Sequence, residues 1–249
     1  MRIAVIADIH GNARALEAVR ADIARRRLDT VINLGDCVSG PLWPAETMAI
    51  LAAENWPCVR GNHDRWVGDE SYPSRGASDV FPRAALDARQ MAWLRDLPPR
   101  LDLEPGILAF HAQPHSDTAY LIEDVADGQM VRAPAARIAE RLVGADARIV
   151  LCGHSHQAHA LQLPDGRWVI NPGSVGCPAY ADPTPPNPHV SESGSPSARY
   201  AVLSIEEDQV GIDLISLPYD HAAAASCAER NGRRDWAHAL RTGFTALQL

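Results

Sequence analysis

Short apolar runs that end in a polar residue alternate with segments of helical periodicity along the chain as far as His154. Arg2–Asp8 is the first such run, and Ala13–Arg27 follows it with apolar residues at helical spacing. The alternation predicts further strands at Thr30–Asp36, Pro57–Asn62, Gly106–His111 and Ala147–His154, and helices at Pro44–Asn55, Phe81–Leu97 and Ala135–Val143. Because strands joined through helices require crossover connections, the pattern predicts a layered α/β core.

After His156 the pattern changes and favours antiparallel hairpins. The predicted hairpins are Ala160–Leu163 with Arg167–Ile170 and Arg199–Ile205 with Gln209–Leu217. Residues 179–198 are rich in Pro and Ser, and we expect a flexible loop there, either a flap over the substrate or an untethered surface segment. A helix at Ala222–Leu240, broken near Asn231-Gly232, completes what we expect to be a single domain of residues 1–249.

Charge and cysteine content exclude several classes of function. The formal net charge is -8, so the chain has no broad positive field for a polyanion, and no nucleic-acid polymer is expected as a partner. All 23 basic residues are Arg, which excludes lysine Schiff-base chemistry and a Walker-type phosphate loop. The five cysteines follow no CxxC spacing and predict reduced thiols. The N-terminal run is too short for a signal peptide or a membrane span, so we expect a cytoplasmic protein without a membrane partner.

Side chains that can bind metal gather at the ends of the predicted strands. Five of them lie at or just beyond the C-terminal end of an apolar run, at Asp8, Asp36, Asn62, His111 and His154. This is the edge at which α/β sheets gather ligands. His10 and His156 each follow one of these residues at a spacing of two, and carboxylate with imidazole suits a borderline divalent ion. Asp36 follows a glycine that allows a tight turn, and its two oxygens could bridge two ions.

Each residue alone has a simpler explanation, because an Asp after a strand is usually a cap or turn residue and a lone His is usually structural. The ordered set is more specific. The segments Asp8-Ile9-His10-Gly11-Asn12, Gly35-Asp36, Gly61-Asn62-His63-Asp64, Phe110-His111 and Gly153-His154-Ser155-His156 resemble the calcineurin-like metallophosphoesterase superfamily over residues 1–174. Asn171-Pro172-Gly173-Ser174 and Gly40-Pro41 resemble its small bacterial branch of predicted phosphodiesterases.

The resemblance implies a four-layer αββα sandwich with two mixed β-sheets and two metal ions at the strand ends. Carried over residue by residue, it implies one ion held by Asp8, His10, Asp36 and His156, and a second held by Asp36, Asn62, His111 and His154. Asp36 would bridge the two ions. Mn, Fe, Zn, Co and Ni all suit such ligands, so the sequence leaves the identity of the divalent metal open.

Four further residues are candidates for catalysis or substrate binding. His63 follows a ligand and precedes Asp64, which is placed to orient it. The resemblance implies that His63 helps to protonate the leaving group, and the alternative is a structural His in a turn. Arg60 is expected either to contact a phosphate through its guanidinium or to brace an acid. Asn12 is expected either to contact the substrate or, more simply, to cap the first helix.

Together these residues predict a dinuclear-metal-dependent phosphoesterase that hydrolyses a small phosphodiester or phosphomonoester by direct attack of metal-bound hydroxide. A second hypothesis is a catalytically silent interaction module on the same fold, as the retromer subunit of this fold illustrates. Such a module is expected to lack metal ligands or the catalytic His. A third class, the amidohydrolases, orders its Asp and His ligands differently and lacks the Gly-Asn-His-Asp element.

Overall fold

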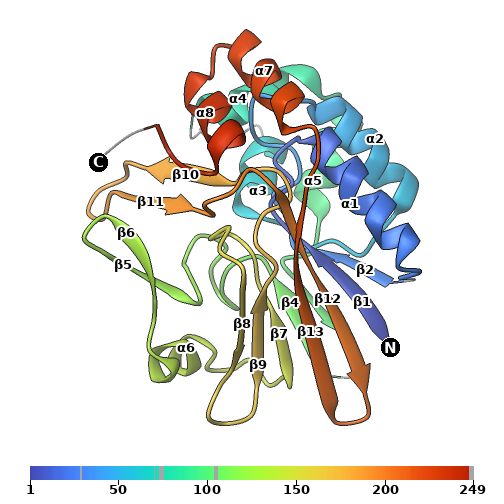
Figure 1. Cartoon of the computed structure of the whole chain (residues 1–249), viewed down its shortest axis with the longest axis vertical. Coiled ribbons are helices and arrows are strands. Elements are labelled where there is room, and N and C mark those ends of the chain that lie inside the picture. Colours follow the sequence, from blue (N-terminus) through green and yellow to red (C-terminus); the bar gives the residue numbers. More distant parts are fainter. Residues whose placement is uncertain (29, 70, 73–75, 104–105, 247–249) are drawn as a thin grey trace.

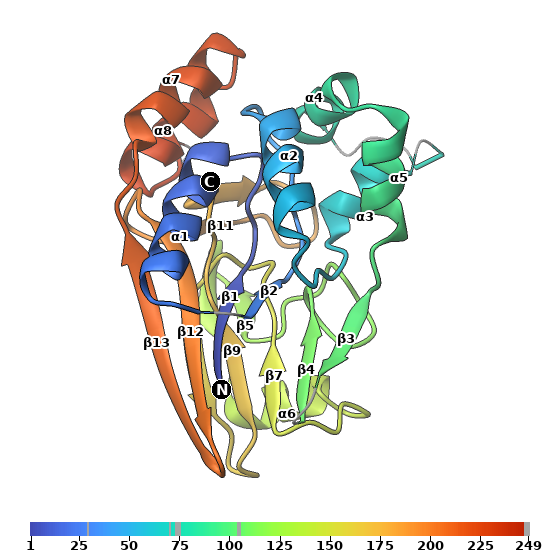
Figure 2. The same cartoon turned by 90° about the vertical axis from the view of Figure 1, so that its right-hand side faces the viewer.

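The computed structural model describes residues 1–28, 30–69, 71–72, 76–103 and 106–246, which contain eight helices and thirteen strands (Figure 1). The helices are α1 (Ala13–Arg25), α2 (Pro44–Glu54), α3 (Asn62–Gly68), α4 (Ala77–Ala85), α5 (Ala88–Asp96), α6 (Ala135–Arg141), α7 (His221–Arg230) and α8 (Arg234–Thr242). Figures 1 and 2 show α7 and α8 at one end of the molecule. The tips of two hairpins, near residues 163–167 and 207–208, lie at the other end.

The strands form three sheets, each with both parallel and antiparallel neighbours. The first sheet has the order β13 (Gln209–Leu217), β12 (Ala198–Glu206), β1 (Arg2–Ile6) and β2 (Thr30–Asn33). The second has the order β3 (Arg100–Leu103), β4 (Ile107–Phe110), β7 (Ile149–Leu151), β9 (Trp168–Asn171) and β8 (His159–Gln162). The third has the order β10 (Ala179–Asp182), β11 (His189–Glu192), β6 (Gln129–Arg132) and β5 (Glu123–Ala126). The α/β class with mixed sheets is confirmed. The prediction of two sheets is wrong, because β5, β6, β10 and β11 form a third sheet.

Three apolar clusters show how the layers pack. Alternate residues of β1 point to opposite faces, so Val5 enters the cluster between the first and second sheets. Ile6 instead enters the cluster that it shares with Leu16 of α1. On the other face of the second sheet, Val150 of β7 packs with Ile138 of α6. Helices therefore cover both outer faces of a pair of stacked sheets.

Residues 179–198 are not an irregular loop, which corrects the prediction from composition. β10 and β11 pair antiparallel, with Ala179 opposite Glu192 and Asp182 opposite His189. β11 also pairs with β6, so the hairpin is part of the third sheet. The four prolines of the segment between Asp182 and His189 lie in the turn, where a missing N–H removes no ladder hydrogen bond. The Pro-rich composition therefore describes the turn and not the strands beside it.

The helix predicted at Phe81–Leu97 is two helices, α4 and α5. Asp87 separates them because it caps α5, and its side chain accepts a hydrogen bond from the Gln90 N–H at 2.8 Å. The Gln90 side chain in turn accepts from the Asp87 N–H at 3.0 Å. This reciprocal pair is a capping box, and its Asp-x-x-Gln spacing was present in the sequence.

The strand predicted at Pro57–Asn62 is reduced to a single parallel bridge between Asn33 and Cys58. The backbone then leaves the first sheet, because the Arg60 N–H donates to the Pro98 carbonyl at 2.8 Å. Asn62 begins α3 instead of ending a strand. Its side chain nevertheless stays near the strand ends, because the bridge holds the segment beside β2.

All five cysteines are buried and free in the structure. Sγ of Cys37 lies 3.9 Å from Sγ of Cys58. Within the described residues, no helix combines the length and the apolar character that a membrane crossing requires.

We expect Ile149→Ala to lower the free energy of unfolding by about 2–5 kcal/mol, because it opens a cavity in the fully buried cluster between the two stacked sheets. Urea denaturation followed by circular dichroism measures the change. Leu214→Ala on β13 is the matched control, since Leu214 is 43% exposed, and its effect should stay within about 0.5 kcal/mol. Equal losses in the two variants would contradict this placement of the core.

Candidate metal centre

The loops that follow β1 and β2 lie side by side and carry three of the predicted ligands. The Asp8 N–H donates to the Gly35 carbonyl at 3.0 Å, and the His10 N–H donates to the Asp36 carbonyl at 2.9 Å. A third loop reaches the same place at Gly61. A Cβ added to Gly61 would lie 2.1 Å from Oδ1 of Asp36, so a larger residue there would displace the carboxylate. Glycine at this position is therefore a requirement of close packing at the site.

The backbone at the predicted ligands adopts an uncommon conformation. Among the described residues, nine that are not glycine have positive φ, and five of these are Asp8, His10, Asp36, His154 and His156. Their φ angles lie between 51° and 69°. Such conformations cost on the order of 1–3 kcal/mol each and persist only where the surrounding structure enforces them. This concentration of backbone strain points to a functional site.

A first group of candidate ligand atoms comes from Asp8, His10 and His156 and lies within 4.8 Å. The Cys177 carbonyl lies 2.7 Å from Nδ1 of His156, so Nδ1 carries the proton and Nε2 is left as an acceptor. Nδ1 of His10 lies 3.1 Å from the carbonyl and 2.7 Å from the hydroxyl of Ser39. The two Nε2 atoms face each other at 3.1 Å. Oδ1 of Asp8 lies 3.5 Å from Nε2 of His156, and it is buried without a hydrogen-bond partner.

The first group fits a metal cation. Two imidazole nitrogens and a carboxylate oxygen converge on one buried space, and this is a donor set that borderline divalent ions accept. Burial, with the negative charge of Asp36, raises the pKa of Asp8 to about 8. Burial lowers the pKa of His10 to about 4. Without a cation, the group therefore avoids charge by keeping Asp8 protonated and His10 neutral.

A second group of candidate ligand atoms comes from Asp36, His111 and His154. Nδ1 of His111 donates to the Leu34 carbonyl at 2.7 Å, which directs Nε2 toward the site. Nε2 lies 3.3 Å from Oδ2 of Asp36 and 2.9 Å from Oδ1 of Asn62. Asn62 is neither an acid nor an imidazole. Its amide oxygen nevertheless lies beside the second group.

Asp36 lies between the two groups. Its Oδ2 is 3.3 Å from Nε2 of His111 in the second group and 3.9 Å from Nε2 of His10 in the first. Burial opposes ionisation of Asp36, but the positive charges of His111 and His63 hold its pKa well below the usual value. Burial likewise opposes the charge on His111, but Asp36 raises the pKa of His111 to about 10. A proton on His111 thus balances Asp36 when no metal ion is bound.

His154 completes the second group with the opposite ring orientation. Its Nε2 donates to the Thr118 carbonyl at 3.1 Å, so Nδ1 is the nitrogen left for a ligand. The seven residues predicted as metal ligands from the sequence are therefore brought together from the ends of both stacked sheets.

The same segments match known proteins. A family model described as the calcineurin-like phosphoesterase superfamily domain matches residues 1–191. The chain belongs to the calcineurin-like phosphoesterase superfamily. The matched residues include all seven candidate ligands, and they end within β11 of the third sheet.

Three similar proteins match nearly the whole chain. An uncharacterised protein of Methanocaldococcus jannaschii is 28% identical over 260 residues, which cover 94% of each chain. The crystal structure of a metallophosphoesterase from Sphaerobacter thermophilus is 25% identical, covers 98% of this chain and 99% of that chain, and has a TM-score of 0.73. A hypothetical protein from Pyrococcus horikoshii has a TM-score of 0.75 at 20% identity, with the same coverage. The structural similarity thus extends over most of the chain beyond the residues that the family model matches.

His63 lies beside the two candidate ligand groups, but its acidic partner differs from the predicted one. Oδ1 of Asp79, on α4, is 2.6 Å from Nδ1 of His63. Burial alone would lower the pKa of His63, but the negative charges of Asp36 and Asp79 outweigh it and raise that pKa. The side chain of His63 is 26% exposed. Sequence analysis missed Asp79 because it lies sixteen residues along the chain, in a segment without a motif.

Asp64 does not orient His63, which corrects the prediction. Its Oδ2 accepts from the N–H of Asp36 at 2.8 Å and from the N–H of Gly61 at 2.9 Å. Its Oδ1 accepts from the N–H of Cys37 at 2.8 Å. Asp64 therefore joins the two loops that carry Asp36 and Asn62 and acts on the metal centre through the backbone.

The two residues predicted to bind substrate have other partners. Nη1 of Arg60 donates to the Arg95 carbonyl at the end of α5 at 2.9 Å, so Arg60 braces α5 in this structure. Oδ1 of Asn12 accepts from the Ala15 N–H at 3.2 Å and caps α1. Nδ2 of Asn12 donates to the Gly176 carbonyl at 3.0 Å. The simpler explanation of Asn12, a helix cap, is the one that the structure supports.

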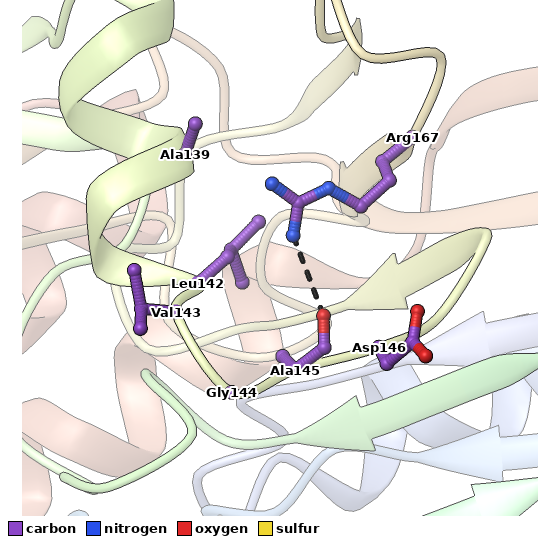
Figure 3. Close-up of a pocket in the computed structure, with 7 residues that line it drawn as sticks. All are labelled: Ala139, Leu142, Val143, Gly144, Ala145, Asp146 and Arg167. Atoms are coloured by element: carbon purple, nitrogen blue, oxygen red, sulfur yellow. Dashed lines mark hydrogen bonds between the residues drawn. The ribbon is translucent and has the colours of Figure 1, made fainter.

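A surface cavity of about 310 Å³ lies beside α6 and is distinct from the metal centre. Figure 3 shows its lining residues, which are Ala139, Leu142, Val143, Gly144, Ala145, Asp146 and Arg167. The guanidinium of Arg167 donates to the Ala145 carbonyl at 3.4 Å and is held against the cavity wall. None of these residues belongs to either ligand group, so the metal centre is the better candidate for chemistry.

We expect metal binding to release about two protons per chain at pH 7, because Asp8 and His111, with pKa values of about 8 and about 10, are protonated in the metal-free site. Affinity for Mn²⁺ should therefore rise as the pH increases from about 6 to about 9. Isothermal titration calorimetry in two buffers with different ionisation enthalpies counts the protons. Binding that releases no proton would show that other groups hold the ion.

Proposed function

We propose that this chain is a phosphoesterase that uses two divalent metal ions to hydrolyse a small phosphate ester, either a diester or a monoester. The observation that carries the proposal is the position of Asp36, whose Oδ2 faces the buried ligand atoms of both groups. A centre for one ion has no need of a shared carboxylate. In two-metal sites the ions lie about 3.5–4 Å apart, a spacing that one carboxylate can bridge.

The ligands divide between the two ions as the chain presents them. One ion would be held by Asp8, His10, Asp36 and His156, and the other by Asp36, Asn62, His111 and His154. Imidazole and carboxylate accept Mn, Fe, Zn, Co or Ni, so availability decides which metal is bound. When bound, two such ions bring positive charge to the phosphoryl oxygens and make hydroxide available at neutral pH.

The chain orients the bridging carboxylate through α3. The backbone N–H of His63 donates to Oδ1 of Asp36 at 2.9 Å, which leaves Oδ2 toward the two groups. Asp64 fixes the backbone of Asp36 from the other side. The helix that carries Asn62 and His63 therefore sets the direction of the shared ligand.

His63 is the proposed proton donor. The oxygen that leaves phosphorus needs a proton as its bond to phosphorus breaks. Asp79 holds Nδ1 of His63, so Nε2 is the nitrogen that can give the proton. The charges of Asp36 and Asp79 raise the pKa of His63 and so favour its protonated form, and its partial exposure makes it accessible to a substrate. No covalent enzyme intermediate is needed.

The complete ligand set favours an enzyme over a silent interaction module on the same fold. A module without activity has no reason to keep seven converging ligands and a proton donor beside them. The ligand order and the Gly-Asn-His-Asp turn at the start of α3 also differ from those of amidohydrolases. The physiological substrate within the class of phosphate esters is left to a substrate panel.

We expect Asp36→Asn to lower kcat by more than about 100-fold on every ester of a mono- and diester panel. The reason is that loss of a residue that only hydrogen-bonds to a metal ligand already lowers metal affinity or activity by about 10–100-fold. Metal content, measured by plasma mass spectrometry, should fall with activity. Asp22→Asn is the matched control, since Asp22 is also buried but binds Arg25 and Arg26 on α1. Wild-type activity in Asp36→Asn would refute the shared ligand.

We expect His63→Ala to slow esters with alkoxide leaving groups by about 100-fold or more, but p-nitrophenyl esters by less than about 10-fold, because only alkoxides need a proton in the transition state. Asp79→Asn should show the same preference with a smaller loss, since the ring keeps its place but loses a paired charge. Steady-state kinetics at saturating Mn²⁺ measure both. If the two ester types lose activity equally in both variants, His63 is not the general acid.

A further inference from the structure

The hairpin of β10 and β11 lies against the loop that carries two of the metal ligands. This ligand loop, residues 153–157, contains His154 and His156. In Figure 1 the hairpin lies next to β5 and β6 at one side of the molecule, and its strands continue their small sheet. The segment that composition suggested as a loop is therefore placed where it can hold ligands in position.

Hydrogen bonds from the hairpin hold the backbone of the ligand loop. The Ser191 hydroxyl donates to the Ser155 carbonyl at 2.6 Å, between the two ligands. The Gln157 amide donates to the Ser191 hydroxyl at 2.8 Å. Because His154 and His156 both have positive φ, the loop needs such contacts to keep its conformation.

Two tyrosine rings pack on the imidazoles of the same ligands. The ring of Tyr120 stacks on His154, with 4.9 Å between centroids and 25° between planes. The ring of Tyr180 meets His156 edge to face, with 4.7 Å between centroids. Each ligand ring of the loop therefore has one aromatic neighbour from outside the ligand set.

The tyrosine hydroxyls are joined in a hydrogen-bond chain with one direction. Nδ1 of His189 donates to the Asn187 carbonyl at 2.8 Å, so Nε2 of His189 must be an acceptor. The Tyr120 hydroxyl, 2.8 Å away, therefore donates to it. The Tyr180 hydroxyl in turn donates to Tyr120 at 2.9 Å. Burial raises the pKa of both tyrosines, so both remain neutral donors.

We propose that Tyr120, Tyr180 and His189 form a clamp that positions His154 and His156 for metal binding. The clamp is defined by these three residues, and it rests on the dinuclear site proposed above. The hydroxyl chain ties both tyrosine rings to β11, so each ring is held against its imidazole. The three are positioning residues, since none of them is a candidate ligand.

The two tyrosines of the clamp act on ligands of different ions. Tyr120 acts on His154, which belongs to the second ligand group, whereas Tyr180 acts on His156, which belongs to the first. Loss of the Tyr120 hydroxyl breaks both bonds of the chain and releases both rings, whereas loss of the Tyr180 hydroxyl leaves Tyr120 bonded to His189. The effects of the two substitutions should therefore be far from additive.

The test is titration of the metal-stripped full chain with Mn²⁺ by calorimetry. Tyr120→Phe and Tyr180→Phe keep the rings and remove only the hydroxyls. Each should weaken Mn²⁺ binding by about 10–100-fold, the usual effect of a hydrogen-bond partner outside the ligand set, and the double variant should be little worse than Tyr120→Phe alone. Tyr200→Phe is the matched control, because Tyr200 is fully buried but bonds to Asp22 on the helix side of the first sheet. Its Mn²⁺ affinity should match that of the wild type.

His189 supplies an independent arm that does not depend on the tyrosine variants. His189→Leu removes the acceptor and should weaken Mn²⁺ binding as the tyrosine variants do, while His189→Gln offers an amide oxygen in its place and should restore it. Nitrogen NMR of the wild type should show the proton of His189 on Nδ1. Unchanged Mn²⁺ affinity in Tyr120→Phe, Tyr180→Phe and His189→Leu would refute the clamp.

The same titration separates the clamp from the proposals on which it rests. A wild type that binds no Mn²⁺ would refute the metal centre, and the clamp with it. A wild type that binds Mn²⁺ but hydrolyses no ester would refute the enzymatic function alone. An equal loss of affinity in Tyr200→Phe would show a general effect of stability and would also refute the clamp.

Discussion

The structure depends on the way in which buried carboxylate oxygens and imidazole nitrogens are brought together at one site. Oδ1 of Asp8 lies near two imidazole nitrogens, those of His10 and His156, and has no hydrogen-bond partner among the described residues. Polar atoms buried in this way cost free energy unless a charge of opposite sign meets them. Shifted pKa values reduce the cost in the metal-free protein, and cations would remove it. The surrounding fold can be understood as the scaffold that keeps these acceptors together.

That scaffold works by packing loops closely at the ends of strands. Asp64 accepts three backbone N–H groups and thereby joins the loops that carry Asp36 and Asn62. Gly61 makes the approach possible because any side chain there would meet the carboxylate of Asp36. On the other side, the small third sheet supports the loop of His154 and His156. Strained φ angles at five ligands persist because these contacts enforce them from several directions.

The sequence predicted the α/β class and the set of residues that converge, because both depend on local pattern. Polar residues after apolar runs must reach the same sheet edge, whatever the loops between them do. Asp79 could not be found in this way, since it reaches His63 through the placement of α4, which no motif encodes. The partner of Arg60 could not be predicted for the same reason, because the position of α5 decides where its guanidinium points. The hairpin of β10 and β11 was missed because its proline-rich turn dominated the composition of the segment.

The central claim is that two ions share Asp36, and a crystal structure of the metal-loaded chain tests it most directly. Anomalous difference maps collected at the manganese absorption edge locate each ion without reference to the protein. The account predicts two peaks, one contacting Asp8, His10 and His156 and the other contacting Asn62, His111 and His154, with Asp36 in contact with both. A single peak, or two peaks of which Asp36 touches at most one, would contradict it.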